Sequence, residues 1–339
     1  MGITAVYIWD VNEPGTPEGN WRKLGSSTYK GVREGTSWRD RVGRTATISG
    51  DGTTVVSSGM KSGVNSTSNV QVFTWNGKYS TNSASSNAAI WTQKGASLTH
   101  GLSNPEASAI SYTGNVVALG HISLGYKVYE WSGSAWNQRG PDFTASSGFN
   151  DSFGAYQDSV ALSYDGNTLA LGHMYNSSTV DKGVVKVYTW NGSAWSQKGQ
   201  DILGDRSGTY NPNGNFFPWG DRLRICDLSD DGDTLLVATP NYRGTSGTIN
   251  ALGFVRVYKW DGSTWVKSGP DLLPDIQQAY ESFGSSARIS GDAKTVVVGS
   301  SGSSAGGGVA GTSGDKSGAT FTYALSKTCL LYTSDAADE

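Results

Sequence analysis

The stretch VYTWNGSAWSQKG, from Val187 to Gly199, decides the fold because the chain contains it in three closely similar copies. The other two, VYEWSGSAWNQRG and VYKWDGSTWVKSG, span Val128–Gly140 and Val257–Gly269. Each copy has an aromatic-x-Trp sequence before a Gly-containing turn and a Trp-x-x-x-Gly sequence after it. Asn-Gly and Asp-Gly are strong hairpin signals because both central residues must tolerate positive φ. The pattern therefore predicts a β-hairpin that recurs along the chain.

A second hairpin precedes each copy, marked by Ser-x-Asp-Gly or a relic of it and by an apolar run. In the unit that ends at Gly199, we predict strands at Ser159–Ser163, Thr168–Gly172, Val184–Trp190 and Ala194–Gly199. These strands carry apolar residues on both faces, and the unit recurs about every 60–65 residues. An antiparallel four-stranded sheet that is covered on both faces is typical of a blade of an all-β propeller. A β-solenoid is the alternative, but its repeats are shorter and lack paired tight hairpins.

The repeats predict a single β-propeller domain over residues 1–328. We expect complete blades at 26–95, 96–140, 141–199 and 200–269, with partial blades at 1–25 and 270–328. Four complete blades with partial blades at both ends predict a fragment of a six- or seven-bladed ring. The last eleven residues, CLLYTSDAADE (329–339), resemble the translation of a sequencing-library adapter and are left out of the predicted fold.

The composition excludes several classes of protein. Gly supplies 46 of 339 residues and aromatic residues 11%, as expected of short strands joined by tight turns rather than of a disordered chain. The net charge is −3, and no concentrated basic stripe suited to nucleic acid is present. No apolar run approaches the roughly 18 residues of a transmembrane helix. We therefore expect neither a nucleic-acid partner nor a transmembrane segment.

Two stretches resemble the FG-GAP repeat of integrin-alpha-like β-propellers. They are DSFGAYQDSVALSYDGNTLALG (Asp151–Gly172) and ESFGSSARISGDAKTVVVG (Glu281–Gly299), each with the Phe-Gly pair of that repeat. The resemblance to WD-repeat propellers is weaker. The FG-GAP resemblance implies a secreted or cell-surface module for adhesion or recognition that binds protein or glycan partners through loops on one rim.

Three residues are candidates for ligand binding. His121 and His173 follow equivalent apolar strands in successive repeats, so they could converge on one ligand. Trp219 stands where the Phe-Gly repeat would have Phe. No third His or Cys shares the histidine column, so we expect no metal there. The FG-GAP resemblance also makes calcium possible, but a turn such as SYDGNT supplies one carboxylate where calcium wants about six to eight oxygens, so we expect no cofactor.

The sequence leaves three functional classes open. A non-catalytic recognition scaffold is our main hypothesis, and we assign no catalytic residue. A propeller hydrolase or lyase acting on glycans is the first alternative, and a structural component of a surface or matrix without a small ligand is the second. Two carboxylates converging within roughly 5–10 Å would favour the hydrolase.

Overall fold

The computed structural model contains β-strands joined by turns. It describes residues 3–4, 6–10, 20–23, 29–30, 42–60, 68–76, 91–98, 107–121, 125–144, 159–173, 183–204, 209–210, 216–217, 225–240, 252–274, 282–301, 318–325 and 330–332. Within these ranges, no helix has the length and apolar character needed to cross a membrane.

Twenty of the strands form five antiparallel sheets of four strands, which we number as blades one to five. Blade one contains β5 (Val42–Ile48), β6 (Thr54–Met60), β7 (Ser68–Trp75) and β8 (Trp91–Gln93). Blade two contains β9 (Ala107–Ile110), β10 (Val116–His121), β11 (Gly125–Trp131) and β12 (Trp136–Gln138). Blade three contains β13 (Val160–Leu162), β14 (Thr168–His173), β15 (Val184–Trp190) and β16 (Trp195–Gln197). Blade four contains β20 (Ile225–Leu228), β21 (Thr234–Thr239), β22 (Phe254–Trp260) and β23 (Trp265–Lys267), and blade five contains β24 (Phe283–Ile289), β25 (Thr295–Ser300), β26 (Ala319–Leu325) and β27 (Leu330–Tyr332).

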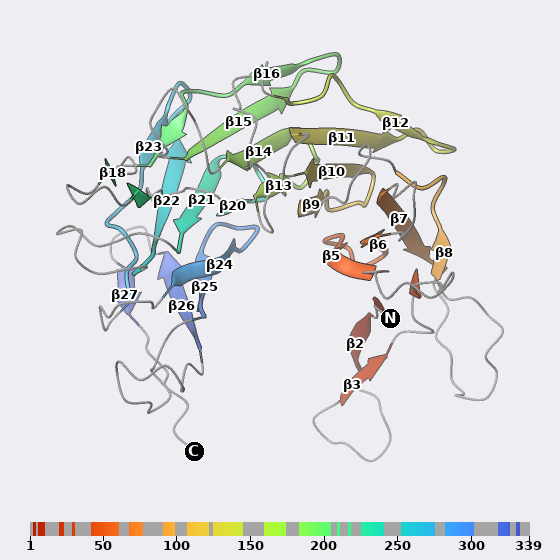
Figure 1. The fold of residues 1–339 in the computed structure, drawn as a ribbon, viewed down its shortest axis with the longest axis horizontal. Helices are drawn as coiled ribbons and strands as arrows, with labels where there is room; N and C mark the ends of the chain where they lie inside the picture. The colour runs from red at the N-terminus through yellow and green to blue at the C-terminus, as the bar shows by residue number, and fades with distance from the viewer. Residues whose placement is uncertain are drawn as a thin grey trace.

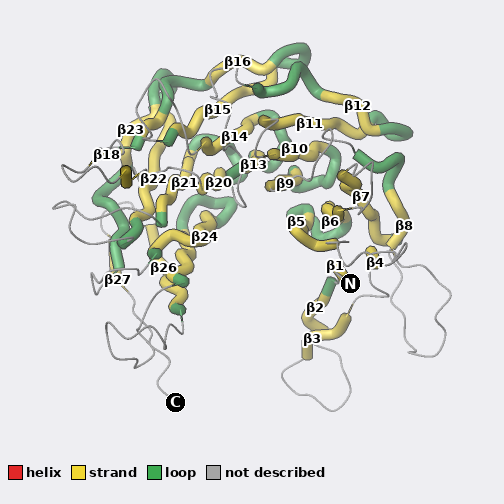
Figure 2. The backbone as a smooth tube through the Cα atoms, in the orientation of Figure 1, coloured by secondary structure: helices red, strands yellow, loops and turns green. Residues whose placement is uncertain are grey.

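The blades follow one another along an arc, as Figure 1 shows. The first strand of each blade lies on the inside of the arc and the fourth strand lies on the outside (Figure 2). Short strands complete the described elements. They are β1 (Ile3–Thr4) paired with β4 (Tyr29–Lys30), β2 (Tyr7–Asp10) with β3 (Asn20–Lys23), β18 (Thr209–Tyr210) with β19 (Phe216–Phe217), and β17 (Ile202–Leu203), which pairs with β15.

The number of blades differs from the sequence prediction. We expected four complete blades with partial blades at both ends, as part of a six- or seven-bladed ring, and the five four-stranded blades show that this was wrong. Blade five is completed by β27, which lies in the C-terminal segment that the prediction left out of the fold. There, Leu330 pairs with Leu325 and Tyr332 with Tyr323. An edge strand such as β26 presents unpaired backbone groups, and β27 pairs with them.

The hydrophobic core is divided into layers between successive blades. Between blades three and four, for example, Val185 and Val187 of β15 pack with Leu235 and Val237 of β21, and all four are fully buried. Similar clusters join blades one and two, two and three, and four and five. Burying such a side chain stabilises the fold by about 1.5–3 kcal/mol. Both faces of the sheets in blades two, three and four are therefore covered by neighbouring blades, as the apolar strands predicted.

The turn between the first two strands of a blade is held by its Ser and Asp side chains. In blade three, the Ser163 hydroxyl donates to Asp165 Oδ1 at 2.7 Å, and the same oxygen accepts from the Asn167 amide at 2.8 Å. The Thr168 amide donates to Ser163 Oγ at 2.9 Å. Equivalent bonds surround Asp51, Asp231 and Asp292. Partial burial would raise the pKa of Asp165, but these hydrogen bonds outweigh it and hold the pKa below its ordinary value.

Candidate functional site

A basic side chain from one blade lies against two tryptophans of the next. In blade two, Arg139 follows β12, and its guanidinium carbon lies 4.9 Å from the ring centre of Trp190 and 5.4 Å from that of Trp195. The same arrangement joins Lys94 to Trp131 and Trp136, and Lys198 to Trp260 and Trp265. We call each such set a clamp. A cation over an indole ring is attracted by the negative face of the ring.

Hydrogen bonds complete each clamp. Arg139 Nη1 donates to the Gly166 carbonyl at 3.1 Å, and Nη2 donates to Asn167 Oδ1. The Trp195 indole nitrogen donates back to the Arg139 carbonyl at 2.8 Å. Lys94 and Lys198 bond in the same way to the first turns of blades two and four. A clamp therefore joins one blade both to the outer hairpin and to the inner turn of the next.

The glycine that ends each Trp-x-x-x-Gly sequence allows this close approach. Gly140 has a φ of 82°, and a Cβ atom there would lie 2.7 Å from Trp195 Cδ1. Gly95 and Gly199 have similar φ values and would meet the tryptophans of the next blade at 2.5 and 2.6 Å. Any other residue would be strained by the backbone and would collide with the ring. The tryptophan and glycine columns therefore fill the space between blades, as the sequence predicted.

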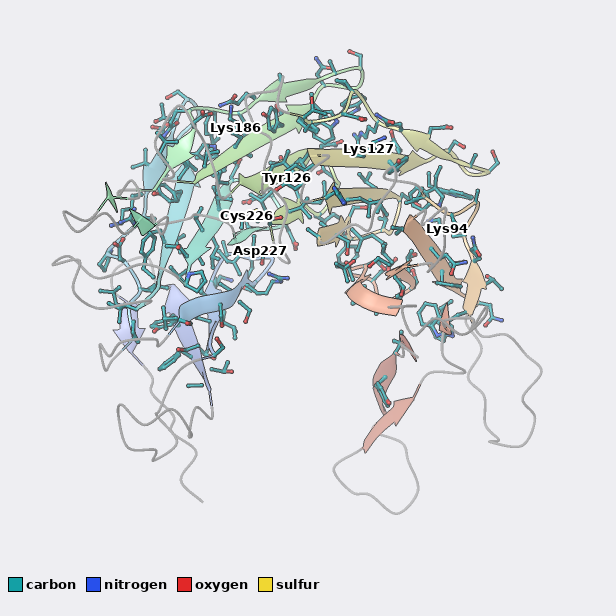
Figure 3. All side chains as sticks on the ribbon, in the orientation of Figure 1. Lys94, Tyr126, Lys127, Lys186, Cys226 and Asp227 are labelled. Atoms are coloured by element: carbon teal, nitrogen blue, oxygen red, sulfur yellow. The ribbon has the colours of Figure 1, made fainter. Side chains whose placement is uncertain are left out.

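A second repeated contact lies beside the clamps. Lys127 of β11 pairs with Asp142 at 3.3 Å, and Lys186 of β15 pairs with Asp201 at 3.5 Å. Arg256 of β22 pairs with Asp271 at 2.7 Å. Figure 3 labels Lys127 and Lys186 on the third strands of their blades. These ion pairs occupy one column of the repeat. We infer that each one attaches the segment after the fourth strand to the third strand of the same blade.

A groove of about 480 Å³ lies between the outer hairpins of blades two and three. It is lined by Glu130, Trp131, Ser132, Asn137, Gln138, Arg139, Gly140, Trp190, Gly192 and Ser193. The hairpins β11–β12 and β15–β16 supply these residues, so the groove is built on strands and tight turns rather than on long loops. Its volume lies within the range of roughly 300–1,000 Å³ that is usual for ligand sites.

The groove contains a buried cation beside an accessible carboxylate. Arg139 is 5% exposed, and its Nε lies 3.6 Å from Glu130 Oε2. The Glu130 side chain is 51% exposed. Because both Nη groups of Arg139 bond to blade three, the Nε–H remains on the side of Glu130, and it has no hydrogen-bond partner among the described residues. Burial lowers the pKa of Arg139, and the charges of Glu130 and Asp165 partly oppose that shift.

Of the predicted ligand-binding residues, His121 is described in full, and it does not line this groove. His121 ends β10 opposite Gly125 and is buried, and His173 ends β14 opposite Val184. They occupy equivalent positions in successive blades, as the repeat predicted. The side chain of His173 and all of Trp219 lie outside the described residues. In the part of the chain that is described, no three His, Cys, Asp or Glu side chains are grouped as a metal site would require.

Sequence reasoning missed Arg139 and Glu130, although the repeat contained a signal for them. The position before the closing glycine is Lys94, Arg139 and Lys198 in successive blades, and an alignment of the repeats shows this basic column. The position before the third-strand tryptophan is Thr74, Glu130 and Thr189. Blade four has Lys259 at this position, so Glu130 is the one carboxylate of the column, and it lies beside Arg139.

The chain is similar to solved structures at low sequence identity. No protein-family profile matches the chain, and no curated protein matches it. Among solved structures, the chain is similar to the β-propeller domain of the Trilobed protease from Pyrococcus furiosus, with 10% identity, a TM-score of 0.46, and coverage of 88% of this chain and 73% of that one. It is also similar to Kuenenia stuttgartiensis hydrazine synthase, with 14% identity, a TM-score of 0.47, and coverage of 88% and 67%.

Proposed function

We propose that this β-propeller is a non-catalytic recognition scaffold that binds protein or glycan partners outside the cell. The observation that carries the proposal is the groove between blades two and three. It combines two indole rings, side-chain amides and hydroxyls, and an accessible carboxylate on rigid hairpins. A concave site with a few fixed polar groups among aromatic surfaces is the usual form of a recognition site.

The acidic content of the groove favours binding over cleavage. Glu130 is the one acidic residue among the described residues that line it, and it faces Arg139. Glycoside cleavage generally uses a pair of carboxyl groups on either side of the bond. The carboxylates of the repeated turns, such as Asp165, already accept several hydrogen bonds within their own turns. We therefore propose that the chain acts without catalysis.

The resemblance to FG-GAP repeats supports an extracellular role in adhesion or recognition. Its Phe-Gly pair at Phe283-Gly284 begins blade five, and Phe283 is fully buried against Phe321 and Tyr323. Gly284 has a φ of 80°, a conformation that favours glycine. Both residues thus have structural reasons for the pattern that carries the resemblance.

The full chain can be tested on a printed array that carries both glycans and extracellular protein domains. We expect saturable binding to members of one class, and mass spectrometry should find the bound glycans unchanged after incubation. Absence of saturable binding to either class would contradict the recognition function. Release of shortened glycans would contradict the non-catalytic assignment.

A further inference from the structure

We infer that Tyr164 and Asp230 together bind an arginine side chain of a protein partner. Both residues lie in first turns, the turns between the first and second strands of their blades. The inference goes beyond the recognition function proposed above, because neither residue lines the groove between blades two and three. It is carried by an aromatic ring with one uncovered face and by an exposed carboxylate beside that face.

Backbone hydrogen bonds join the first turns of successive blades. The Tyr112 amide donates to the Tyr164 carbonyl at 3.0 Å, and the Tyr164 amide donates to the Asp230 carbonyl at 3.0 Å. The Asp230 amide donates in turn to the Gly291 carbonyl at 2.9 Å. The strands that lead into these turns lie on the inside of the arc (Figure 2). The four residues are therefore neighbours at about the 5 Å spacing of hydrogen-bonded strands.

The side chains of this column lean in two directions. A Cβ atom at Gly50 would collide with the Tyr112 ring, so this ring leans toward blade one. The Tyr164 ring stacks on Tyr112, with ring centres 4.1 Å apart and an angle of 15° between the planes. A Cβ atom at Gly291 would collide with the Asp230 carboxylate, so this carboxylate leans toward blade five. The column is therefore open between Tyr164 and Asp230.

Tyr164 has one aromatic face that the described residues leave uncovered. Tyr112 lies between Gly50 and Tyr164 and is 36% exposed, whereas Tyr164 stacks on Tyr112 alone and is 43% exposed. Within the described ranges, the Asp230 side chain makes no hydrogen bond or ion pair, and it is exposed. Both the ring face and the carboxylate are thus accessible to a partner.

A guanidinium group matches this ring and carboxylate together. A cation within about 6 Å of a ring centre is attracted by the negative face of the ring. The planar guanidinium can stack on Tyr164 while its N–H groups donate to the carboxylate of Asp230. An ammonium is a strongly hydrated point charge and stacks less well, and an anionic group would be repelled by Asp230. An uncharged aromatic ring would cover Tyr164 but leave the carboxylate without a partner. The geometry therefore favours arginine.

The charge around this surface also favours a basic partner. Asp165 and Asp231 are exposed in the same two turns. The basic residues that reach these turns, Arg139 and Lys198, are already paired with carboxylates. The full chain has a net charge of −3. The turns of blades three and four therefore present negative charge, which attracts a positively charged segment.

The other neighbouring pairs of this column lack the combination. Blades one and two have Gly50 and Tyr112, and blades two and three have two tyrosines. Blades four and five have Asp230 and Gly291. An aromatic ring and a carboxylate therefore meet in this column between blades three and four.

The test is a fluorine NMR titration of the full chain labelled with fluorotyrosine. The variants Tyr112→Phe and Tyr164→Phe assign the two signals. The probes are blocked tripeptides with arginine, lysine or citrulline between two glycines, where citrulline is an uncharged analogue of arginine. We expect the Tyr164 signal to move saturably with the arginine peptide, with a Kd on the order of 10 mM, as suits one exposed contact. The lysine peptide should bind about threefold more weakly and the citrulline peptide at least about tenfold more weakly.

Two variants and one internal control locate the binding. Asp230→Asn should weaken the arginine peptide about five- to tenfold because it removes the charge of the acceptor. Asp261→Asn is the matched control, because it removes a carboxylate from the outer hairpin of the same blade, where blade three has Asn191, and should leave the affinity unchanged. The signal of Tyr7, which is exposed on β2, should not move. Thermal unfolding of each variant checks that it is folded.

Four outcomes would overturn the inference. They are a Tyr164 signal that does not respond saturably to the arginine peptide, equal binding of the lysine or citrulline peptide, full affinity in the folded Asp230→Asn variant, and equal loss in the folded Asp261→Asn variant. In each case, saturable binding to the printed array would leave the recognition function standing while this site fails. If the Tyr164 signal responds as expected but the array shows no binding, this site stands and the function proposed for the groove fails.

Discussion

The junction between blades three and four and the junction between blades four and five hold neighbouring sheets together in different ways. At the first, Lys198 lies against Trp260 and Trp265 and bonds to the next blade. At the second, Ser268 occupies the position of Lys198, and blade five has Leu325 where blades one to four have tryptophan. At the four junctions between blades one to five, the basic residue and the tryptophans are thus present together or replaced together.

The last junction depends on a different set of contacts. Phe283 is fully buried, and its amide donates to the Leu252 carbonyl of the preceding segment at 3.0 Å. Asp227 Oδ2 of blade four accepts from the Ile289 amide of blade five at 2.9 Å. The comparison teaches that pairs of residues about one repeat apart make the contacts between blades. Each junction can use a different pair.

The largest expected effect is the loss of a clamp tryptophan. Trp265 is 3% exposed, and its indole nitrogen donates to the Lys198 carbonyl at 2.8 Å. Trp265→Ala should lower the free energy of unfolding by about 3–5 kcal/mol, as expected for a large buried aromatic. Urea denaturation measures this loss. The matched control is Ser268→Ala at the junction without a clamp, which should change stability by less than about 0.5 kcal/mol. Equal losses of stability in the two variants would contradict the difference between the two junctions.

A smaller effect is expected at the glycine that contacts the next blade. Gly140→Ala should cost about 2–4 kcal/mol because it combines a positive φ with a collision against Trp195. Gly192→Ala is the control, because φ there is 98° but no atom lies within 4 Å of the added methyl group. It should cost about 1–2 kcal/mol. Chemical denaturation of both variants separates backbone strain from the collision, and equal costs would rule out close packing between the blades.

The smallest effect concerns acid stability in blade five. Hydrogen bonds from the Ser290 hydroxyl and from the Lys294 side chain and amide lower the pKa of Asp292 to about 2. A carboxyl with a pKa lowered by folding stabilises the protein above its unfolded value, and that contribution is lost as pH falls toward its folded value. The melting temperature should therefore fall less between about pH 4 and pH 2 in Asp292→Asn than in the unchanged chain. If the melting temperatures of the variant and of the unchanged chain fall in parallel over this pH range, these hydrogen bonds contribute no stability.

The sequence predicted the parts of the fold that depend on local patterns. The four strands of blade three lie where the turns and apolar runs placed them, and the tryptophan columns pack between blades. The blade count was wrong because β27 pairs by its backbone with the edge of β26, whereas the prediction left this segment out of the fold for its resemblance to a translated adapter. The groove was missed because Arg139 reaches across to Gly166 of the next blade, a contact that depends on how two sheets pack rather than on the pattern within either.

A double-mutant cycle between Lys198 and Trp260 tests the clamp most directly. Lys198→Met keeps most of the side-chain length and removes the charge, and Trp260→Leu removes the ring. Urea denaturation of the two single variants and the double variant gives their coupling free energy. We predict a coupling of about 1–2 kcal/mol, the range of a partly desolvated cation–π contact. The pair Lys198→Met and Trp131→Leu, from different clamps, should be additive within about 0.5 kcal/mol. A coupling near zero between Lys198 and Trp260 would contradict the conclusion that these clamps hold neighbouring blades together.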